Sequence, residues 1–429
     1  MSDIRLVSLF TGAGGLDYGF EVAGFKIRVA LEMDKDSCAT LRNNRPWPVI
    51  EQDIHKVKGK QILEAGGLKR GDVDILVGGP PCQPFSKSGY WANGDTKRLK
   101  DPRADTLHAF MRCVDELLPE VFFLENVHGI SYSGKEEGFQ LLQRMTERIN
   151  RKNGTGYRIS WKVLDASNFG VPQQRTRFFL VSHRDGRIFH FPEPTHRSIN
   201  GGQALLASDK LAPVVTSWDA IGHFGEPPLD ENLRVNGKWG DLLPSIPEGE
   251  NYLWHTNRKG GLPLFGWRTR YWSFLLKLAK ARPSWTIQAQ PGPAVGPFHW
   301  NNRRLSVKEM AAIQTFPKDT EFVGGRNSVQ KQIGNAVPSL LSEILARAIT
   351  EQLFDIPARG HPILTVAPRR PIPPPEPVQP VPEEYFKFVG RHPDHPGTRK
   401  GRSAKSGTVW QTGGTKGGRN EQQHIETTP

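Results

Sequence analysis

The sequence predicts an α/β fold with a doubly wound parallel sheet and a second, smaller, loop-rich domain. Up to residue 185, short apolar runs alternate with segments of helical spacing, which is typical of a parallel sheet covered by helices. Beyond residue 185, glycine, proline and tryptophan are frequent and the periodicity weakens. Helical spacing returns near the end, so we expect the chain to go back to the first domain. A length of 429 residues suits two or three domains.

The elements of the first domain follow from local patterns. Apolar runs predict strands over 5–10, 25–31, 73–77, 121–124 and 177–182. Glycines from Gly12 to Gly15 predict a tight turn after the first strand, and a helix over 16–22 follows. Apolar side chains at helical spacing predict a helix over 105–118, and later helices over 306–315 and 338–354.

Composition restricts the class of protein. No apolar run is long enough to span a membrane, and no secretory signal is expected at the N-terminus. Three cysteines cannot form a disulfide scaffold and suit a reducing cytosol. A net charge of +13 favours a polyanionic partner.

The turn after the first strand predicts a nucleotide-like ligand. Glycines let a ligand approach the backbone, and a helix N-terminus attracts negative groups. Glu32 lies 20 residues beyond Gly12, where an acid can bind ribose hydroxyls. The dinucleotide pattern fails because its last position is Asp17, so an adenosyl cofactor without a pyrophosphate fits better. The alternative is a glycine turn of any α/β protein.

Cys82 follows the strand 73–77 in the loop Gly-Gly-Pro80-Pro81-Cys82. Cys38 and Cys113 lie in helical patterns and suit buried apolar positions. Cys82 lies instead among turn formers at the carboxyl end of a strand, where α/β enzymes place their sites. A nucleophile is the sharper interpretation.

With these motifs the sequence resembles the DNA cytosine-C5 methyltransferases of bacterial restriction–modification systems. The similar segments occur in the family's order over residues 6–350: Phe10-Thr-Gly-Ala-Gly-Gly15, Glu32, Asp53-Ile54, Pro80-Pro-Cys82-Gln83, Glu125-Asn-Val127, Gln173-Gln-Arg175-Thr-Arg177, Arg304 to Pro317, and Gln332-Ile-Gly-Asn335-Ala-Val-Pro338. The resemblance implies an S-adenosyl-L-methionine-dependent, Rossmann-like methyltransferase domain with a target-recognition domain.

It also implies domain boundaries. Residues 1–185 would form the catalytic and cofactor-binding domain and 186–317 the target-recognition domain. Residues 318–356 would return to the catalytic domain. Proline, glycine and small polar residues predict a mostly disordered basic tail over 357–429.

The resemblance implies a role for individual residues. The catalytic set is Cys82, Glu125, Arg175 and Arg177. The cofactor set is Phe10, Gly12, Gly14, Gly15, Glu32, Met33, Asp53, Ile54, Pro80, Leu107, Asn335 and Val337. Met33 stands where relatives can carry an aromatic residue, and the segment containing Leu107 follows the family pattern only loosely. The expected DNA contacts are Ser86, Ser88, Arg98, Arg268, Arg270 and Arg304.

The implied reaction begins with a cytosine extruded from duplex DNA. The Cys82 thiolate adds to C6, C5 takes the methyl group, and H5 and the thiolate then leave. Glu125 would engage N3 and the exocyclic amine, which requires burial to raise its pKa. Arg175 would hold the base oxygen, with Arg177 supporting the same wall.

A run of seven basic and no acidic residues predicts phosphate or guanine contacts in the second domain. It comprises Arg258, Lys259, Arg268, Arg270, Lys277, Lys280 and Arg282. Four aromatic residues lie among them: Trp267, Tyr271, Trp272 and Phe274. The simpler interpretation of these side chains is that they form the core of a small domain. The base sequence that is read does not follow from these residues.

We expect S-adenosyl-L-methionine without a metal, double-stranded DNA as partner, no membrane, a monomer, and pairing with a restriction endonuclease in a bacterial cytoplasm. One alternative is a tRNA cytosine-C5 methyltransferase of the same family. The absence of any cysteine after Cys113, and so of the tRNA enzymes' Cys-Phe-Thr signature, favours DNA. A second alternative, an inactive DNA-binding regulator, disagrees with the intact motif set.

Overall fold

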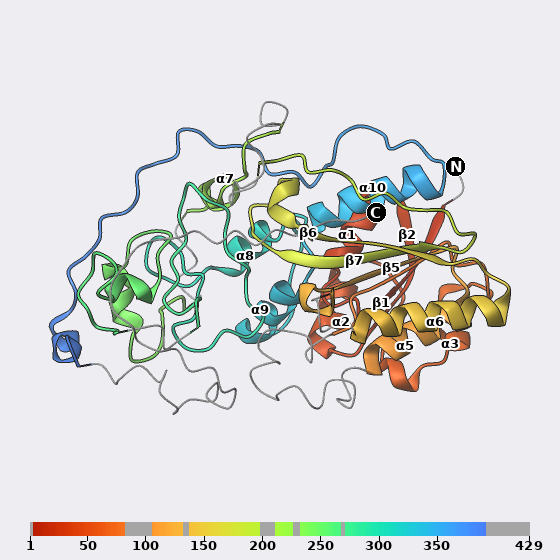
Figure 1. Ribbon diagram of the computed structural model, residues 1–429, viewed down its shortest axis with the longest axis horizontal. Helices are drawn as coiled ribbons and strands as arrows, with labels where there is room; N and C mark the ends of the chain where they lie inside the picture. Colours follow the sequence, from red (N-terminus) through yellow and green to blue (C-terminus); the bar gives the residue numbers. More distant parts are fainter. Residues whose placement is uncertain are drawn as a thin grey trace, which may run out of the picture.

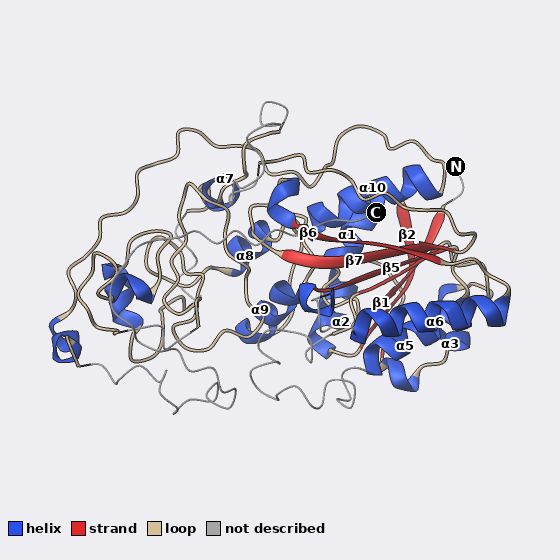
Figure 2. Ribbon diagram, viewed as in Figure 1, coloured by secondary structure: helices blue, strands red, loops and turns tan. Residues whose placement is uncertain are grey.

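A seven-stranded sheet organises the chain, with helices on both faces and a loop-rich region at one end (Figures 1 and 2). The computed structural model describes residues 3–81, 105–131, 137–197, 211–225, 232–266 and 271–391. The strand order is β3-β2-β1-β4-β5-β7-β6. The strands are β1 (Ile4–Leu9), β2 (Phe25–Glu32), β3 (Val49–Glu51), β4 (Ile75–Gly78), β5 (Val121–Val127), β6 (Arg158–Asp165) and β7 (Thr176–His183).

The sheet is mixed, and this corrects the expectation of a parallel one. Strands β1 to β5 pair in parallel, but β7 runs antiparallel to both β5 and β6. The connection from β6 to β7 is short and contains no crossover helix of the kind that parallel neighbours need. The strand order reverses between β1 and β4, which is where doubly wound sheets bind ligands.

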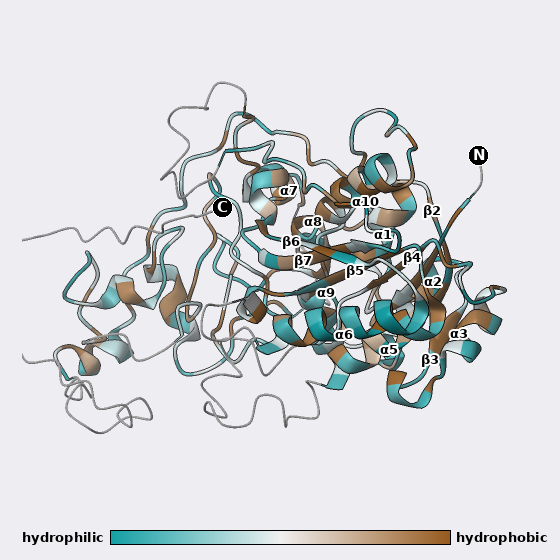
Figure 3. Cartoon of the chain, turned by 45° about the vertical axis from the view of Figure 1, so that its right-hand side comes forward, coloured by the Kyte–Doolittle hydropathy of each residue, from teal (hydrophilic) through white to brown (hydrophobic). Residues whose placement is uncertain are grey.

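Two hydrophobic cores lie on the two faces of the sheet. Phe123 belongs to one core and its neighbour Phe122 to the other, because successive strand residues point to opposite faces. Helices α1 (Gly15–Val22) and α10 (Ser339–Leu353) cover the first face, and α3 (Gly59–Gly66), α5 (Asp105–Leu117) and α6 (Glu137–Asn153) the second (Figure 1). The outer surface of α6 is hydrophilic and the strands between the layers are mainly hydrophobic (Figure 3). None of the helices in the described ranges combines the length and apolar character needed to cross a bilayer.

The contact between α1 and α10 brings the end of the chain onto its beginning. A Cβ at Gly19 would lie 2.5 Å from both Ser339 O and Glu343 N, so only glycine allows this approach. Ser342 donates a hydrogen bond to the Leu16 carbonyl across the same interface. The segment after residue 318 therefore packs against the first helix.

The loop-rich region has its own core but little regular structure. Leu242, Tyr252, Phe265 and Phe274 are buried together. The helices α7 (Ser217–Ile221) and α8 (Val307–Ile313) flank this region. Met310 of α8 belongs to the core beneath the sheet, so α8 packs with the first domain although the sequence places it before the boundary at 317.

Residues 357–391 differ from the disordered tail expected from residue 357. They form a strap that runs from α10 to the far end of the loop-rich region (Figure 1). Its Tyr385 is buried and stacks on Trp239 at 5.3 Å. Its Glu376 pairs with the buried Lys280 at 2.7 Å. Apart from a short 3-10 helix over Glu383–Phe388, the described part of this proline-rich segment has no helix or strand, yet Tyr385 is buried against the loop-rich region. Residues 392–429 lie outside the described residues.

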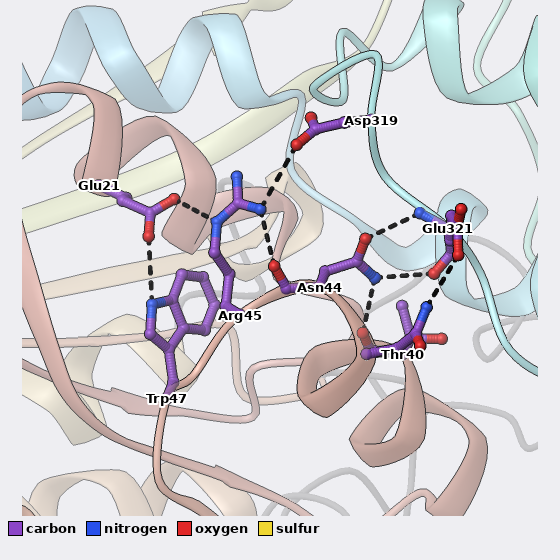
Figure 4. A network of polar contacts seen from close by, with 8 residues as sticks. Glu21, Thr40, Asn44, Arg45, Trp47, Asp319 and Glu321 are labelled. Atoms are coloured by element: carbon purple, nitrogen blue, oxygen red, sulfur yellow. Dashed lines mark hydrogen bonds and ion pairs between the residues drawn. The ribbon is translucent and has the colours of Figure 1, made fainter.

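A polar network fastens the segment before α9 (Arg326–Asn335) to the start of the chain (Figure 4). Arg45 donates to Glu21 at 2.7 Å and lies 3.7 Å from Asp319. Asn44 exchanges two hydrogen bonds with the backbone of Glu321. These contacts join positions almost 280 residues apart and fix the approach to α9.

The glycine contact predicts that side chains at position 19 destabilise the protein in order of size. Overpacking a tight interior typically costs about 1–3 kcal/mol, so we expect G19A to lower the free energy of unfolding in denaturant and G19V to lower it further. G292A is the control, since its Cβ would meet only Val295 at 3.7 Å. Equal stability of G19V and wild type would contradict the packing described.

Candidate active site

A cleft of about 850 Å³ opens at the carboxyl ends of β1, β2, β4 and β5. Its volume suits a ligand of nucleoside size. Eleven of the predicted residues line it: Phe10, Gly12, Gly15, Glu32, Met33, Pro80, Glu125, Arg175, Arg177, Asn335 and Val337. The cleft therefore brings together residues from both ends of the described chain.

The glycine turn forms the floor of the cleft. Phe10, Gly12 and Gly14 have φ values of 55°, 58° and 84°, so the backbone reverses sharply between β1 and α1. Gly12 has no atom within 4 Å of an added Cβ and faces open space. A Cβ at Gly15 would lie 2.7 Å from the Val337 carbonyl, so this glycine lets the loop after α9 close over the turn.

The Glu32 carboxylate is held in place by backbone donors. It accepts from Gly12 N at 2.7 Å and from the N–H groups of Met33 and Asp34 at 2.8 Å. Its remaining acceptor capacity suits a ribose hydroxyl. Met33 is 66% exposed beside it and offers a flexible apolar surface.

Four residues predicted for the cofactor do not line the cleft. Leu107 is buried in the core under α5, and Gly14 packs against Tyr18 and Leu41. Asp53 caps a short helical turn by accepting from His55 N at 3.0 Å. The Ile54 carbonyl accepts from Arg112 at 2.8 Å.

Two strands place a carboxylate and a guanidinium together at the other end of the cleft. In the antiparallel register Glu125 lies opposite Phe179 and Val127 opposite Arg177, so Glu125 and Arg177 are diagonal neighbours. Glu125 lies 3.1 Å from Arg177 Nε and both side chains are mostly buried. Burial raises the pKa of Glu125, and the charges of Arg177 and Arg175 partly oppose the rise. The carboxyl is thus closer to protonation at neutral pH than an exposed one.

Arg175 is almost completely buried beside this pair. Its Nη2 donates to the Gly334 carbonyl at 2.8 Å, whereas Nε and Nη1 have no hydrogen-bond partner among the described residues. Buried donors normally have a partner. Two donors of this cleft-lining arginine are nevertheless left without a partner in the described part of the chain.

Cys82, the predicted nucleophile, lies outside the described residues. The chain leading to it is fixed, because Asn126 donates to the Pro80 carbonyl at 3.2 Å and Thr106 to the Pro81 carbonyl at 3.0 Å. Pro80 and Pro81 line the cleft, together with Glu125. The described segment therefore ends, at Pro81, in the wall of the cleft.

The structure adds cleft residues that the sequence did not single out. Asp17, Asn126, Lys331 and Gln332 all line it. Asp17 lies in the first turn of α1, and both its oxygens are buried without a hydrogen-bond partner in the described part of the chain. Burial raises the pKa of Asp17 to about 7, although the nearby Ser8 hydroxyl and the backbone partly oppose the rise. Asp17 follows the glycine turn and is the residue that breaks the dinucleotide pattern. This position was the feature of the sequence that could have indicated a cleft residue.

Five of the six predicted DNA contacts lie outside the described residues: Ser86, Ser88, Arg98, Arg268 and Arg270. Arg304 is half-buried and donates to Gln330 of α9 at 3.2 Å.

The basic run is only partly available to DNA. Lys277 and Lys280 are buried, and Lys280 is held by Glu248 at 2.9 Å. Phe274 is core, whereas Tyr271 and Trp272 are exposed. The prediction that the run contacts phosphate or guanine is therefore wrong for these two lysines.

The family model of the C-5 cytosine-specific DNA methylases matches residues 4–351. The chain belongs to this family. It is therefore a DNA cytosine-5-methyltransferase, and the family's chemistry implies use of S-adenosyl-L-methionine. The turn, the carboxylate of Glu32 and the size of the cleft fit such a cofactor.

Curated relatives agree with the family. The chain is 41% identical over 381 residues to the Type II methyltransferase M.SacI of Streptomyces achromogenes, covering 83% of this chain and 95% of that one. It is 32% identical to the Type II methyltransferase M1.HphI of Haemophilus parahaemolyticus, covering 81% and 86%.

Solved structures share the fold at lower identity. A protein assigned as a DNA modification methyltransferase encoded within an E. coli prophage has a TM-score of 0.56 and 23% identity, covering 82% of this chain and 100% of that one. A variant of Spodoptera frugiperda DNMT2 has a TM-score of 0.53 and 16% identity, with the same coverage.

Asp17 predicts a stability that depends on pH. Its folded-state pKa lies above the unfolded value, so the native state holds the proton more tightly and the wild type loses stability as pH rises from about 4 to about 7. D17N lacks this loss. We therefore expect the free energy of unfolding of D17N minus that of wild type to rise by roughly 4 kcal/mol from pH 4 to pH 7, at 1.36 kcal/mol per pKa unit. Above about pH 7 this difference should stay constant.

Denaturant unfolding at several pH values measures this difference. D319N is the matched control, because the Asp319 side chain is 74% exposed. A difference between D17N and wild type that does not change between pH 4 and 7 would contradict the buried, unpartnered carboxylate.

Proposed function

We propose that Cys82 attacks C6 of a cytosine turned out of duplex DNA, and that Glu125, Arg175 and Arg177 form the pocket for this base. The observation that supports it is the buried Glu125–Arg177 pair with the unsatisfied donors of Arg175, in the same cleft as the glycine turn. Addition of the thiolate makes C6 tetrahedral and C5 nucleophilic. After C5 has taken the methyl group, H5 leaves as a proton to water, and departure of the thiolate restores the ring.

Each polar group has a distinct part in this proposal. Negative charge on the base develops toward N3, and a carboxyl whose pKa is raised by burial can meet it with a proton or hydrogen bond. The free donors of Arg175 suit the base oxygen. Arg177 holds the Glu125 carboxyl in position from the neighbouring strand.

The cofactor end of the cleft completes the proposal. Glu32 would hold the ribose, Met33 would cover the adenine, and Gly12, Gly15, Asn335 and Val337 would line the space around it. When bound, S-adenosyl-L-methionine supplies the methyl group. We infer that no metal takes part, because the proposed chemistry has a nucleophile, a proton donor and an electrophile without one.

We further propose that the enzyme is a monomer that modifies one DNA sequence in a bacterial cytoplasm, as the partner of a restriction endonuclease. The names of the curated relatives as Type II methyltransferases support this. Protection of cellular DNA from a nuclease encoded beside it is the corresponding test.

Methylation assays test the substrate and the nucleophile together. We expect the purified chain to transfer methyl groups from S-adenosyl-L-methionine to duplex DNA and not to tRNA, and to form a covalent adduct with duplexes containing 5-fluorocytosine. C82S should lose both reactions, whereas C113S should keep them, since Cys113 is buried in the core. Transfer only to tRNA, or full activity of C82S, would overturn the proposal.

A further inference from the structure

One ion pair links the two sides of the cofactor cleft. Lys331 Nζ of α9 lies 2.8 Å from Asp34 Oδ2, and both residues line the cleft. Asp34 comes two residues after Glu32 and begins α2 (Lys35–Asn44). The pair therefore joins the ribose-binding edge of the sheet to a helix almost 300 residues further along the chain.

Asp34 is suited to this contact because its other oxygen is already fixed. Oδ1 accepts from Ser37 N and from the Ser37 hydroxyl, both at 3.0 Å, so the side chain caps α2. Oδ2 is left for Lys331. Although burial alone would raise it, hydrogen bonds from Lys331 and Ser37 lower the pKa of Asp34, so the carboxylate is charged at neutral pH.

The same helix reaches the rest of the site through adjacent residues. Gln332 accepts from the buried Thr40 hydroxyl of α2 at 2.7 Å. The Gly334 carbonyl accepts from Arg175 at 2.8 Å. Gln330 donates to the Gln288 carbonyl in the loop-rich region at 3.3 Å. A shift of α9 would therefore move the cofactor wall and the partner of Arg175 together.

We propose that Lys331 is a positioning residue for the cofactor, which acts by holding α9 against Asp34 and so keeps the cleft in its binding shape. This rests on the proposed role of the cleft as the cofactor site. A lost pair leaves α9 freer in the empty enzyme, and binding must then also order the helix. Lys331 is part of the wall of the cleft and has no contact with the reacting atoms in this proposal.

The substitutions can separate charge from capping. D34N keeps the cap on α2, because asparagine caps helices as well as aspartate does, but removes the charge. K331Q removes the other charge, and K331R keeps it. The matched control is R42Q, since Arg42 of α2 pairs with Glu51 at 2.6 Å outside the cleft and is similarly exposed: 48% and 31% for that pair, against 42% and 30% for Lys331 and Asp34.

We expect K331Q and D34N each to raise the Kd for S-adenosyl-L-methionine, measured by calorimetry, by roughly fivefold, about 1 kcal/mol at 1.4 kcal/mol per tenfold. The double variant should bind no more weakly than either single one, because both remove the same contact. K331R should restore most of the affinity and R42Q should leave it unchanged. KM for the cofactor should rise, with kcat at saturating cofactor retained.

Wild-type affinity in K331Q, or losses that add in the double variant, would overturn the inference. So would a rise in the Kd of R42Q equal to that of K331Q, with an equal drop in the melting temperatures of the two cofactor-free proteins, because general destabilisation would then explain the weaker binding. A wild-type chain that binds no S-adenosyl-L-methionine would instead contradict the proposed function, so the two failures are distinguishable.

Discussion

The antiparallel pairing of β5 with β7 is the constraint on which the site depends. It puts Glu125 and Arg177 side by side at the carboxyl end of β5, although they are 52 residues apart, and leaves Arg175 just before β7 to enter the same cleft. If β7 ran parallel to β5, the carboxyl end of β7 would lie at this edge of the sheet, and Arg175 and Arg177 would lie at the opposite edge. Glu125 offsets the burial of Arg177, and the Gly334 carbonyl takes one donor of Arg175, whereas the two guanidinium groups repel each other.

The end of the cleft proposed for the cofactor depends on a different constraint, namely how closely two segments of backbone can approach each other. Gly15 lets the Val337 carbonyl lie over the glycine turn, and Gly19 lets α10 lie on α1. These two contacts, with the network of Figure 4, close the fold by packing the last helices against the first. The cleft is thus a product of the whole chain, and its two walls are joined where Lys331 meets Asp34.

The sequence predicted much of this architecture, and the exceptions have physical causes. The strands β1, β2, β4, β5 and β7 and the helices α1, α5, α8 and α10 carry clear apolar patterns and lie close to their predicted bounds. β3 has only three residues, and β6 is an edge strand with few fully buried positions, so neither was predicted. The direction of β7 depends on tertiary pairing. The strap over 357–391 is held by single anchors such as Tyr385, which composition does not reveal.

For the site, motif order identified eleven of the residues that line the cleft but not how they are held. The sequence carried no signal for the contact of Lys331 with Asp34, since it arises only when α9 packs against the start of α2. The most direct measurement of the central claim is a crystal structure of the enzyme trapped on a 5-fluorocytosine duplex. We predict that the base lies in the cleft, with Glu125 at its N3 and amine edge and Arg175 at its oxygen. A trapped base held by other side chains, with Glu125 still bound only to Arg177 and Arg175 only to the Gly334 carbonyl, would contradict it.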